Sequence, residues 1–387
     1  MYIERDAEQH IVKRMAFFPV MVVTGARQAG KTTLMRKLFP EWAYFNLESP
    51  ATRALAEADP VSFVSSHQDG LLLDEVQRMP ELLSYIQAAV DEDRRAGRFV
   101  LSGSQNILLG ENVSQTLAGR AAYYEIAPLS YRELLAASLA DTNVFTEIFN
   151  GGYPGQRKDR VPPDLFFDAY LATYVERDVR QVKNISDLSL FRKFMLLLAG
   201  RAGQVVDYTS LANDVGVSPG TVRGWISVLE AGYIVRILPP YFNNFGKRYI
   251  KSPKIYFKDT GLLCYLLGIS NAEAASQHFM RGNLFENYVI LEIEKILRKR
   301  GARFALYFYR ESHGNEIDLV VETEQQTIPI EIKSSATFSK AFMKGIRYWE
   351  NATGSENQPS FIIYGGPGQT AGNTTLLRWT DLDQIGV

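Results

Sequence analysis

A glycine-rich segment near the N-terminus constrains the fold more strongly than any other feature of this sequence. Residues 18–24 (FPVMVVT) form a short apolar run typical of a strand that is buried on both faces. Residues 25–32 (GARQAGKT) match the pattern G-x-x-x-x-G-K-[ST], and the next residues, TLMRKLF, have the composition of a helix. A strand, this loop and a helix in that order predict an α/β domain with a phosphate-binding loop.

The residue types of the loop suit a nucleoside triphosphate. Its glycines let backbone N–H groups turn toward phosphates at a helix N-terminus, where the helix dipole favours an anion. We expect Lys31 to reach the β- and γ-phosphates of ATP and Thr32 to ligate Mg²⁺. A chance glycine-rich turn is the alternative, and the strand-to-helix setting disfavours it. The residues expected to bind the nucleotide are Gly25, Ala26, Arg27, Gln28, Ala29, Gly30, Lys31, Thr32, Thr33 and, from the next motif, Asp74.

Two further apolar runs end in polar side chains that suit ATP hydrolysis. Residues 70–75 (GLLLDE) predict a buried strand that ends in two acids: Asp74, expected to bind Mg²⁺, and Glu75, expected to polarise the attacking water. Acids also occur where a strand simply meets solvent, but the glycine-rich loop favours the catalytic interpretation. Residues 98–104 (RFVLSGS) predict a third strand. Ser104 at its end is a candidate sensor of the γ-phosphate, and a polar strand end without that role is the alternative.

The chain resembles one branch of the prokaryotic AAA+ ATPases in five segments, in this order: TGARQAGKTT, LLLDEVQRMPELL, RFVLSGSQN, LAGRAAYYEIAPLSYREL and GGYP. The C-terminal half of those proteins was long catalogued as a domain of unknown function. The resemblance implies a five-stranded parallel sheet with helices on both faces. It also makes Arg120 a candidate arginine finger or sensor, acting in trans if the chain forms a homo-oligomer. A surface arginine that closes a helix is the alternative. Arg177 and Arg180 are the candidates for a second sensor position, but their spacing does not support that role.

The middle of the chain has the pattern of a winged helix-turn-helix. Residues 208–216 (YTSLANDVG) predict a short helix that ends at a glycine, and the Ser-Pro pair at 218–219 is suited to begin a second helix. A turn and the apolar strand YIVRIL follow. If this segment binds DNA, Thr221 and Arg223 lie early on the second helix, where groove contacts are made. If it is a packing module instead, Trp225 belongs to its core. Both interpretations stay open.

A basic and aromatic stretch follows the second helix. Residues 236–258 contain six Lys or Arg residues and no acid. Aromatic residues are interleaved with them: Tyr241, Phe242, Phe245, Tyr249, Tyr256 and Phe257. Cations that bind phosphates and rings that stack on bases are the composition of a surface that binds a nucleic-acid strand. Aromatic residues of a buried core are the alternative.

Acids and a lysine alternate with buried isoleucines near the C-terminus. Residues 317–322 and 328–333 predict two strands of a hairpin, with Glu331 and Lys333 on one face and Asp318 close to both. Two carboxylates beside a lysine can hold Mg²⁺ and orient the water that attacks a phosphodiester. An amphipathic hairpin with a solvated face is the alternative.

This hairpin resembles the PD-(D/E)xK nuclease fold, a restriction-endonuclease-like α/β fold. Asp318, Glu331 and Lys333 occupy the motif positions, and Glu286 on the helix predicted over 284–297 matches a glutamate that many members carry. The resemblance implies Asp318, Glu331 and Glu286 as metal ligands. The segment Asn315-Glu316-Ile317 replaces the usual proline before the first acid, which puts cleavage activity in doubt.

The junction-like segment GGYPGQRKDRVPP, rich in glycine, proline and charge, indicates a domain boundary near residue 150. We therefore expect an AAA+ P-loop ATPase domain over residues 1–150. A helical linker with the winged helix-turn-helix domain would follow over 151–260, and a PD-(D/E)xK nuclease-like domain over 261–387. Together they predict an α/β protein.

Composition limits the remaining possibilities. The net charge of −1 means that any nucleic-acid-binding surface is local. One cysteine excludes an internal disulfide, and four scattered histidines make a structural zinc site improbable. The sequence has no apolar run near the roughly 20 residues that a membrane-spanning helix needs, and its charged N-terminal segment differs from a signal peptide. We expect a cytoplasmic protein without a membrane partner.

The motifs together predict a Mg²⁺-dependent ATPase that remodels or processes DNA through its C-terminal domains. A different class of function competes with this one. In it the protein is a regulatory nucleotide switch whose C-terminal half binds a protein partner and has no nuclease activity.

Overall fold

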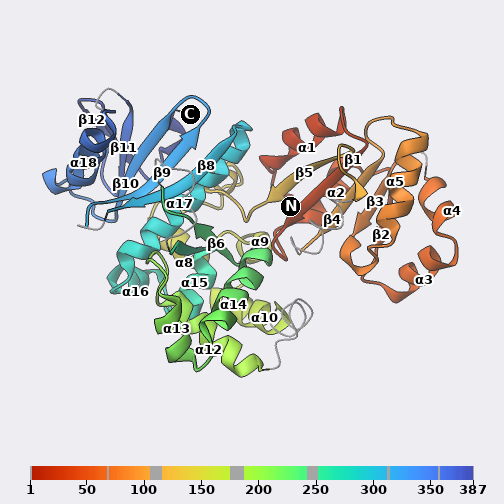
Figure 1. Cartoon of the computed structure of the whole chain (residues 1–387), viewed down its shortest axis with the longest axis horizontal. Helices are drawn as coiled ribbons and strands as arrows, with labels where there is room; N and C mark the ends of the chain where they lie inside the picture. The colour runs from red at the N-terminus through yellow and green to blue at the C-terminus, as the bar shows by residue number, and fades with distance from the viewer. Residues whose placement is uncertain are drawn as a thin grey trace. The chain divides into compact units, whose positions relative to one another are not determined.

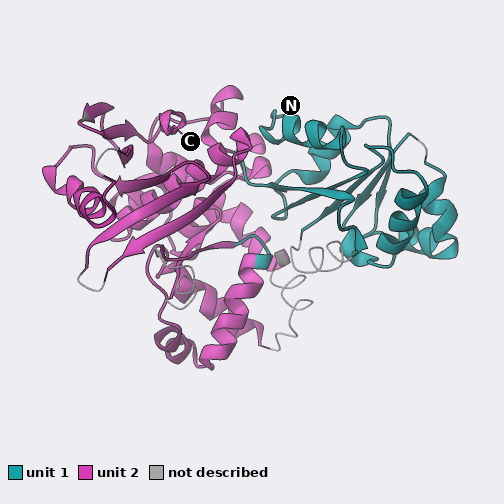
Figure 2. Cartoon of the chain, turned by 45° about the horizontal axis from the view of Figure 1, so that its top comes forward, with its two compact units in different colours: residues 1–129, 231–234 teal, residues 130–230, 235–387 magenta. Residues whose placement is uncertain are grey.

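The chain forms two units in the computed structural model (Figure 2). The model describes residues 2–67, 69–104, 116–174, 187–241, 252–311, 314–355 and 358–386. The first unit comprises residues 1–129 and 231–234, and the second comprises residues 130–230 and 235–387. The N-terminal segment of the first unit thus ends at Leu129, before the boundary expected near residue 150.

A five-stranded parallel sheet lies at the centre of the first unit (Figure 1), which confirms the predicted sheet. Its strand order is β2-β3-β4-β1-β5. The strands are β1 (Val20–Gly25), β2 (Ala43–Asn46), β3 (Leu71–Asp74), β4 (Phe99–Gly103) and β5 (Ala121–Ile126). The helices of this unit are α1 (Ala7–Met15), α2 (Lys31–Leu38), α3 (Pro50–Ala58), α4 (Pro60–Ser65) and α5 (Leu82–Glu92), with a 3₁₀ turn at Val76–Arg78.

Both faces of this sheet are covered by apolar side chains. On one face, Val22, Leu73 and Leu101 pack in a core cluster with Leu82 and Ile86 of α5. Because side chains alternate along a strand, the intervening residues point to the opposite face. Those residues (Met21, Val23, Leu72 and Val100) are buried as well. Burial on both faces explains why these strands are continuous apolar runs in the sequence.

The helical part of the second unit contains the expected helix, turn, helix and strand. Its helices are α7 (Tyr131–Ala136), α8 (Val144–Asn150), α9 (Pro154–Asp159), α10 (Pro163–Tyr174), α12 (Leu188–Ala199), α13 (Tyr208–Val215), α14 (Pro219–Ala231), α15 (Thr260–Leu266) and α16 (Ala272–Gln277). Gly216 ends α13 in the left-handed conformation, and the Ser218 hydroxyl accepts a hydrogen bond from the N–H of Thr221 at the start of α14. Strands β6 (Val235–Leu238) and β7 (Lys254–Phe257) then pair in an antiparallel ribbon.

Trp225 lies in the core of this helical part. The side chain on α14 is buried, and its ring contacts the rings of Phe191 and Phe194 on α12. This packing agrees with the expectation that Trp225 is a core residue.

A mixed six-stranded sheet forms the C-terminal part of the second unit, in the order β12-β13-β11-β10-β9-β8. Strands β8 (Phe304–Arg310), β9 (Glu316–Thr323) and β10 (Thr327–Lys333) are antiparallel neighbours. Strands β11 (Ser360–Tyr364) and β13 (Thr374–Arg378) continue the sheet in parallel with β10, and β12 (Gln369–Ala371) closes it. Helices α17 (Arg281–Arg300) and α18 (Met343–Thr353) both contact β10, and 3₁₀ turns lie at Lys340–Phe342 and Leu382–Gln384.

The two glycines of the GGYP segment, which the sequence suggested as a domain junction, let its backbone approach the side chain of Asp259 in the second unit. The N–H of Gly152 donates to the buried carboxylate of Asp259 over 2.7 Å, and Asp259 also caps α15. Gly151 has φ +69°, and a Cβ there would lie 2.4 Å from Asp259 Oδ1. The segment is therefore a packing contact within the second unit, in which the two C-terminal domains expected from the sequence lie together.

Among the described residues, each helix is too short or too polar to cross a lipid bilayer.

We expect Gly151→Ala to lower the stability of the second unit by more than about 1 kcal/mol, because alanine is strained at this φ and its methyl group overlaps a buried carboxylate. The urea midpoint of unfolding, followed by tryptophan fluorescence, measures the change. Gly155→Ala on α9 is the matched control, since a Cβ there meets its nearest atom at 3.6 Å. Equal midpoints for the two variants would contradict this role of Gly151.

Candidate functional site

The glycine-rich loop connects β1 to α2 in a conformation that depends on its glycines. Gly25 has φ +142°, and a Cβ there would lie 2.2 Å from the carbonyl oxygen of Ile126. Gly30 precedes α2 with φ +94°. The ammonium of Lys31 is buried and donates to the carbonyl oxygens of Gly25 and Ala26, each over 2.9 Å. The loop thus folds around its own lysine at the N-terminus of a helix, which is the arrangement expected of a phosphate-binding loop.

Asp74 is the centre of a hydrogen-bond network at the end of β3. The carboxylate is buried and accepts hydrogen bonds from Thr32 Oγ1 over 2.6 Å, from Tyr44 over 3.1 Å and from the hydroxyl of Ser102. Burial and the charge of Asp74 raise the pKa of Tyr44, so the phenol keeps its proton as a donor. The two residues expected to hold Mg²⁺, Thr32 and Asp74, are therefore adjacent, although 42 positions separate them in the sequence.

Glu75 and Ser104 lie together beside this network. The Ser104 hydroxyl donates to Glu75 Oε2 over 3.2 Å, and Gln77 donates to the same carboxylate oxygen. Glu75 has a left-handed backbone with φ +57°, which costs free energy in a residue with a side chain. Such conformations occur often where a side chain must be held for a function. Glu75 is thus held at the end of β3 by side chains from two neighbouring segments.

Arg120 lies away from the loop. Its guanidinium binds both carboxylate oxygens of Asp91 on α5, over 2.8 Å each. Arg120 precedes β5, and the register pairs Val20 with Ala121 and Gly25 with Ile126. Arg120 therefore lies at the amino-terminal end of the strands, about 20 Å along the strand direction from the loop at their carboxyl end. An arginine at this end of the sheet is too far away to act on nucleotide bound to its own chain. The finger role predicted for it therefore requires a second chain.

Arg5 is a contact of the loop that sequence patterns did not indicate. Its buried guanidinium donates to the carbonyl oxygen of Ala29 over 2.8 Å and to that of Ala127 over 2.6 Å. It thereby connects the loop to the segment after β5. The residue stands in a charged N-terminal stretch, where nothing local distinguishes it from its neighbours.

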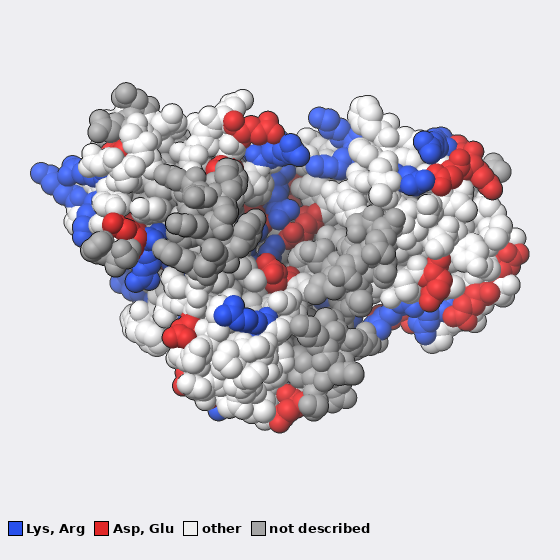
Figure 3. Space-filling model, in the orientation of Figure 1, with Lys and Arg blue, Asp and Glu red and all other residues white. Residues whose placement is uncertain are grey.

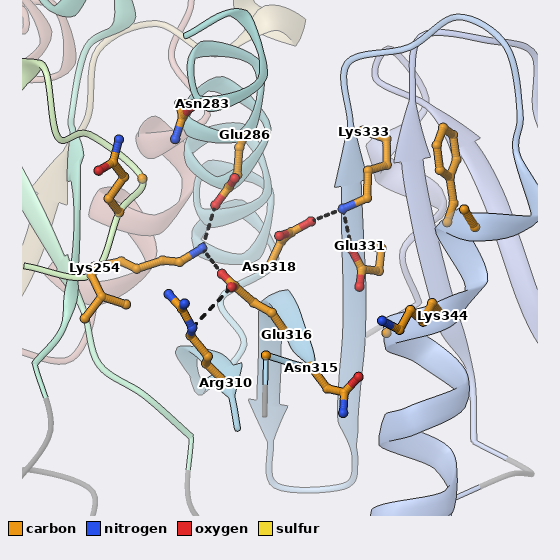
Figure 4. Close-up of a pocket in the computed structure, with 17 residues that line it drawn as sticks. Lys254, Asn283, Glu286, Arg310, Asn315, Glu316, Asp318, Glu331, Lys333 and Lys344 are labelled. Carbon is orange, nitrogen blue, oxygen red and sulfur yellow. Dashed lines mark hydrogen bonds and ion pairs between the residues drawn. The ribbon is translucent and has the colours of Figure 1, made fainter. Parts of the chain in front are cut away.

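A polar cavity of about 590 Å³ in the second unit contains the acids predicted near the C-terminus (Figure 4). Lys333 donates to Asp318 Oδ2 over 2.9 Å and to Glu331 Oε2 over 2.6 Å, so both carboxylates face one ammonium. The β9–β10 register ends with Leu319 opposite Ile330, which brings the next residues, Asp318 and Glu331, side by side. The structure therefore brings together the three side chains predicted for the motif.

The two carboxylates differ in their affinity for a proton. Burial and the negative charge of Asp318 raise the pKa of Glu331 to about 9. Burial also opposes ionisation of Asp318, but the ammonium groups of Lys333 and Lys254 outweigh it and lower the pKa of that carboxyl. Two acids that share one ammonium at close range do not both ionise readily. Asp318 therefore carries the charge, and Glu331 holds a proton near neutral pH.

Glu286 lies in the same cavity but has other partners. Its carboxylate accepts hydrogen bonds from Lys254 over 3.1 Å and from the hydroxyl of Tyr256. Burial raises its pKa to about 7, although Lys254 opposes this shift. Within the described residues no three His, Cys, Asp or Glu side chains are grouped closely enough to hold a metal ion. The structure thus brings Asp318 and Glu331 together as a pair and does not add Glu286 as a third ligand.

Gly345 on α18 lets the helix approach this acid pair. A Cβ at this position would lie 1.8 Å from Glu331 Oε1 and 2.5 Å from the carbonyl oxygen of Glu316. The absence of a side chain therefore makes room for the Glu331 carboxylate between α18 and the hairpin. Sequence patterns did not indicate this glycine.

The described part of the basic and aromatic stretch is largely internal. Arg236 and Lys258 form ion pairs with the buried Glu294, over 2.8 and 3.8 Å, and Tyr256 and Phe257 are buried in the core. Stacking on bases is therefore the wrong interpretation for these two rings, and the core alternative applies. Residues 242–251, which include Phe242, Phe245, Lys247, Arg248, Tyr249 and Lys251, lie outside the described residues, as do Arg177 and Arg180.

The residues proposed for a DNA groove also have contacts within the chain. Arg223 lies 3.9 Å from the centroid of the Tyr208 ring, and the Thr221 hydroxyl contacts the hydroxyl of Ser218. On the face drawn in Figure 3, basic and acidic side chains of the described residues are interspersed.

Three family models match successive parts of the chain. An AAA domain matches residues 18–135, and two domains of unknown function, DUF8612 and DUF4143, match residues 141–273 and 281–381. The AAA match covers the glycine-rich loop, Asp74, Glu75 and Arg120. The matches agree with the α/β parallel-sheet fold of the first unit.

The chain is also similar to complete proteins. It is 35% identical over 345 residues to the uncharacterized proteins Mb2031c of Mycobacterium bovis and Rv2008c of Mycobacterium tuberculosis, covering 87% of this chain and 75% of each relative. A solved Walker-type ATPase of Pyrococcus abyssi superposes with a TM-score of 0.46 at 11% identity, over 68% of this chain and 96% of that one. From the extent of the mycobacterial matches, we conclude that this chain, which contains an AAA domain, belongs to the same family as Mb2031c and Rv2008c.

Proposed function

We propose that the protein is a Mg²⁺-dependent ATPase whose C-terminal unit acts on DNA. The observation that carries the ATPase part is the direct hydrogen bond between Thr32 and Asp74 beside the glycine-rich loop. A hydroxyl and a carboxylate in contact provide hard oxygen ligands that suit Mg²⁺. Thr32 and Asp74 would hold this ion, which would supply positive charge to neutralise the phosphates.

Each residue of the first unit has a separate part in this proposal. Lys31 leaves the loop carbonyls and binds the β- and γ-phosphates. Glu75 accepts a hydrogen bond from the attacking water and orients it in line with the γ-phosphate. Ser104 holds Glu75 and would respond to the γ-phosphate. Arg120 of a second chain would supply the remaining positive charge. The Arg120 of the same chain lies at the amino-terminal end of the strands, whereas the nucleotide site lies at their carboxyl end.

The C-terminal cavity supports action on a phosphodiester. Asp318 and Glu331 present carboxylate oxygens to one common point, now occupied by the Lys333 ammonium, and such oxygens suit Mg²⁺ or Mn²⁺. These two residues would hold the ion, which would polarise a phosphate oxygen and lower the pKa of a bound water. Lys333 and two further cations of the cavity lining, Arg310 and Lys344, would then contact phosphate oxygens.

One observation favours a second candidate function. The described cations of the basic stretch pair with internal acids, which leaves them less suited to bind a DNA backbone. In this second function the ATPase is a regulatory switch, and the C-terminal unit binds a protein partner without cutting DNA. The cleavage experiment below separates the two functions.

Lys31→Ala should weaken ATP binding by about 10- to 100-fold, because a charge-assisted contact to phosphate contributes about 1.5–3 kcal/mol. Glu75→Gln should keep ATP affinity and lower turnover by at least about 100-fold, because it removes the group that orients water. Fluorescent-nucleotide titration and phosphate release measure the two effects. Lys37→Ala and Glu57→Gln, at exposed positions of α2 and α3, are the matched controls. Turnover in Glu75→Gln equal to that of its control would refute the assigned role.

Arg5→Met should weaken ATP binding by up to about tenfold, or about 1.4 kcal/mol, because two loop-bracing hydrogen bonds are lost. The same titration measures this loss. Arg14→Met is the control, because Arg14 lies on α1 and bonds to the His10 carbonyl instead of the loop. An affinity unchanged from wild type would restrict Arg5 to a role in folding.

Asp318→Asn should abolish any Mg²⁺- or Mn²⁺-dependent DNA cleavage and leave ATP turnover unchanged, because the residue lies in the second unit. Gel assays with single-stranded, duplex and branched DNA measure the cleavage. Glu324→Gln on the exposed turn of the same hairpin should cut as wild type does. If the wild-type protein cuts none of these DNAs with either metal, the regulatory switch is the better proposal.

A further inference from the structure

Lys254 is a buried cation in the C-terminal cavity that the metal site proposed above does not use. It begins β7 and is 3% exposed. Its ammonium lies 3.1 Å from Glu286 Oε1 and 2.6 Å from Glu316 Oε1. A buried ammonium is costly unless carboxylates surround it, and here two of them do. Its position and charge are therefore fixed by the fold.

The Lys254 ammonium lies among the carboxylates that would be needed to bind a second metal ion beside Asp318. Figure 4 shows Lys254 reaching toward Glu286 and Glu316 from one side of Asp318, with Lys333 on the other side. Lys333 and Glu331 complete the far side of the cavity. Asp318 thus has a lysine on each side.

A second divalent cation would need these same acids. In two-metal sites the ions lie about 3.5–4 Å apart and share carboxylate ligands. Around Asp318 the remaining carboxylates are Glu286 and Glu316, and both are paired with Lys254. An ion arriving there would meet the repulsion of a buried ammonium in a region of low dielectric constant. Among the described residues, no group of three His, Cys, Asp or Glu side chains could hold a metal ion.

We propose that the Lys254 ammonium takes the place of a second metal ion, so that the cavity binds one divalent cation, at Asp318 and Glu331. The inference rests on the proposed function, which assigns that pair to a metal. In this arrangement Glu286 is a counter-ion of Lys254 and not a metal ligand. Lys254 is a positioning residue, because its buried ammonium holds Glu286 and Glu316 and does not reach a substrate.

The number of bound ions tests the proposal without depending on activity. Mn²⁺ is titrated into the full chain without nucleotide, and the bound fraction is counted by electron paramagnetic resonance. All proteins carry Asp74→Asn, which removes the acid of the nucleotide site. We expect one Mn²⁺ per chain in this background. Two ions per chain would overturn the proposal.

Variants of Lys254 give the sharper comparison. Lys254→Met removes the buried charge at similar length and leaves Glu286 with the Tyr256 hydroxyl and Glu316 with the more exposed Arg310. We therefore expect a second Mn²⁺ to bind. Lys254→Arg keeps the charge and should bind one ion. Lys295→Met removes another ion pair of the second unit, the 2.7 Å contact with Glu292 on α17, and should also bind one. A Lys254→Met protein that folds, by circular dichroism, and still binds one ion contradicts the proposal.

A second variant serves if Lys254→Met does not fold. Glu286→Gln keeps the size of the side chain and should change Mn²⁺ affinity by less than about tenfold, the smallest loss typical of removing a group that supports a metal ligand. A larger loss would make Glu286 a ligand and overturn the proposal. Asp318→Asn separates this failure from failure of the proposed function. If Asp318→Asn still binds Mn²⁺ as the background protein does, the metal site itself is wrongly assigned.

Discussion

Buried carboxylates impose the constraint on which both candidate sites depend. A carboxylate taken from water into a protein interior costs several kcal/mol unless donors or cations surround it. Asp74 meets this requirement with hydroxyl donors from three neighbouring segments, at Thr32, Tyr44 and Ser102. Asp318 meets it with Lys333 and with the backbone N–H of Ile332. In each case the groups that form hydrogen bonds to the buried carboxylate lie where the proposed ligand would bind.

The parallel sheet is what gathers the donors of Asp74. Strands β1, β3 and β4 run in the same direction, so their carboxyl ends meet at one edge. The glycine-rich loop after β1, the acids that end β3 and the serines of β4 therefore become neighbours without any long side chain bridging them. The hairpin of β9 and β10 achieves the same result with two strands, because its register places Asp318 beside Glu331. Gly345 completes this second site by leaving space that any side chain would fill.

Patterns of local order predicted much of this structure from the sequence. The loop between strand and helix, the helix that ends at Gly216 and the hairpin with Asp318 and Glu331 each depend on periodicity or turn chemistry within a short segment. The contacts of Arg5, Lys254 and Gly345 depend on residues far away in the chain, such as the 122 positions between Arg5 and Ala127. A composition count also could not tell that Tyr256 and Phe257 face a core, because β7 is buried along its whole length. Composition also could not tell why glycine occurs at Gly151. The glycine and proline content of this segment suggested a domain boundary, whereas in the structure Gly151 lets the backbone lie close to Asp259.

In both candidate sites a lysine ammonium satisfies oxygen atoms close to where the proposed ligand would bind. Lys31 donates to two carbonyl oxygens of the loop that is expected to bind phosphates, and Lys333 joins the two acids expected to bind a metal. Each lysine keeps buried oxygen atoms satisfied while no ligand is bound, so neither site has to be assembled from unpaired groups. The cost is that a ligand must replace these hydrogen bonds before it gains affinity. For phosphates the exchange is favourable, because Lys31 only turns from neutral carbonyls to an anion. For a metal ion the exchange is harder, because Lys333 must leave two carboxyl groups and Glu331 must lose its proton. Metal affinity at the proposed C-terminal site would therefore be set by this competition as much as by the geometry of the two acids.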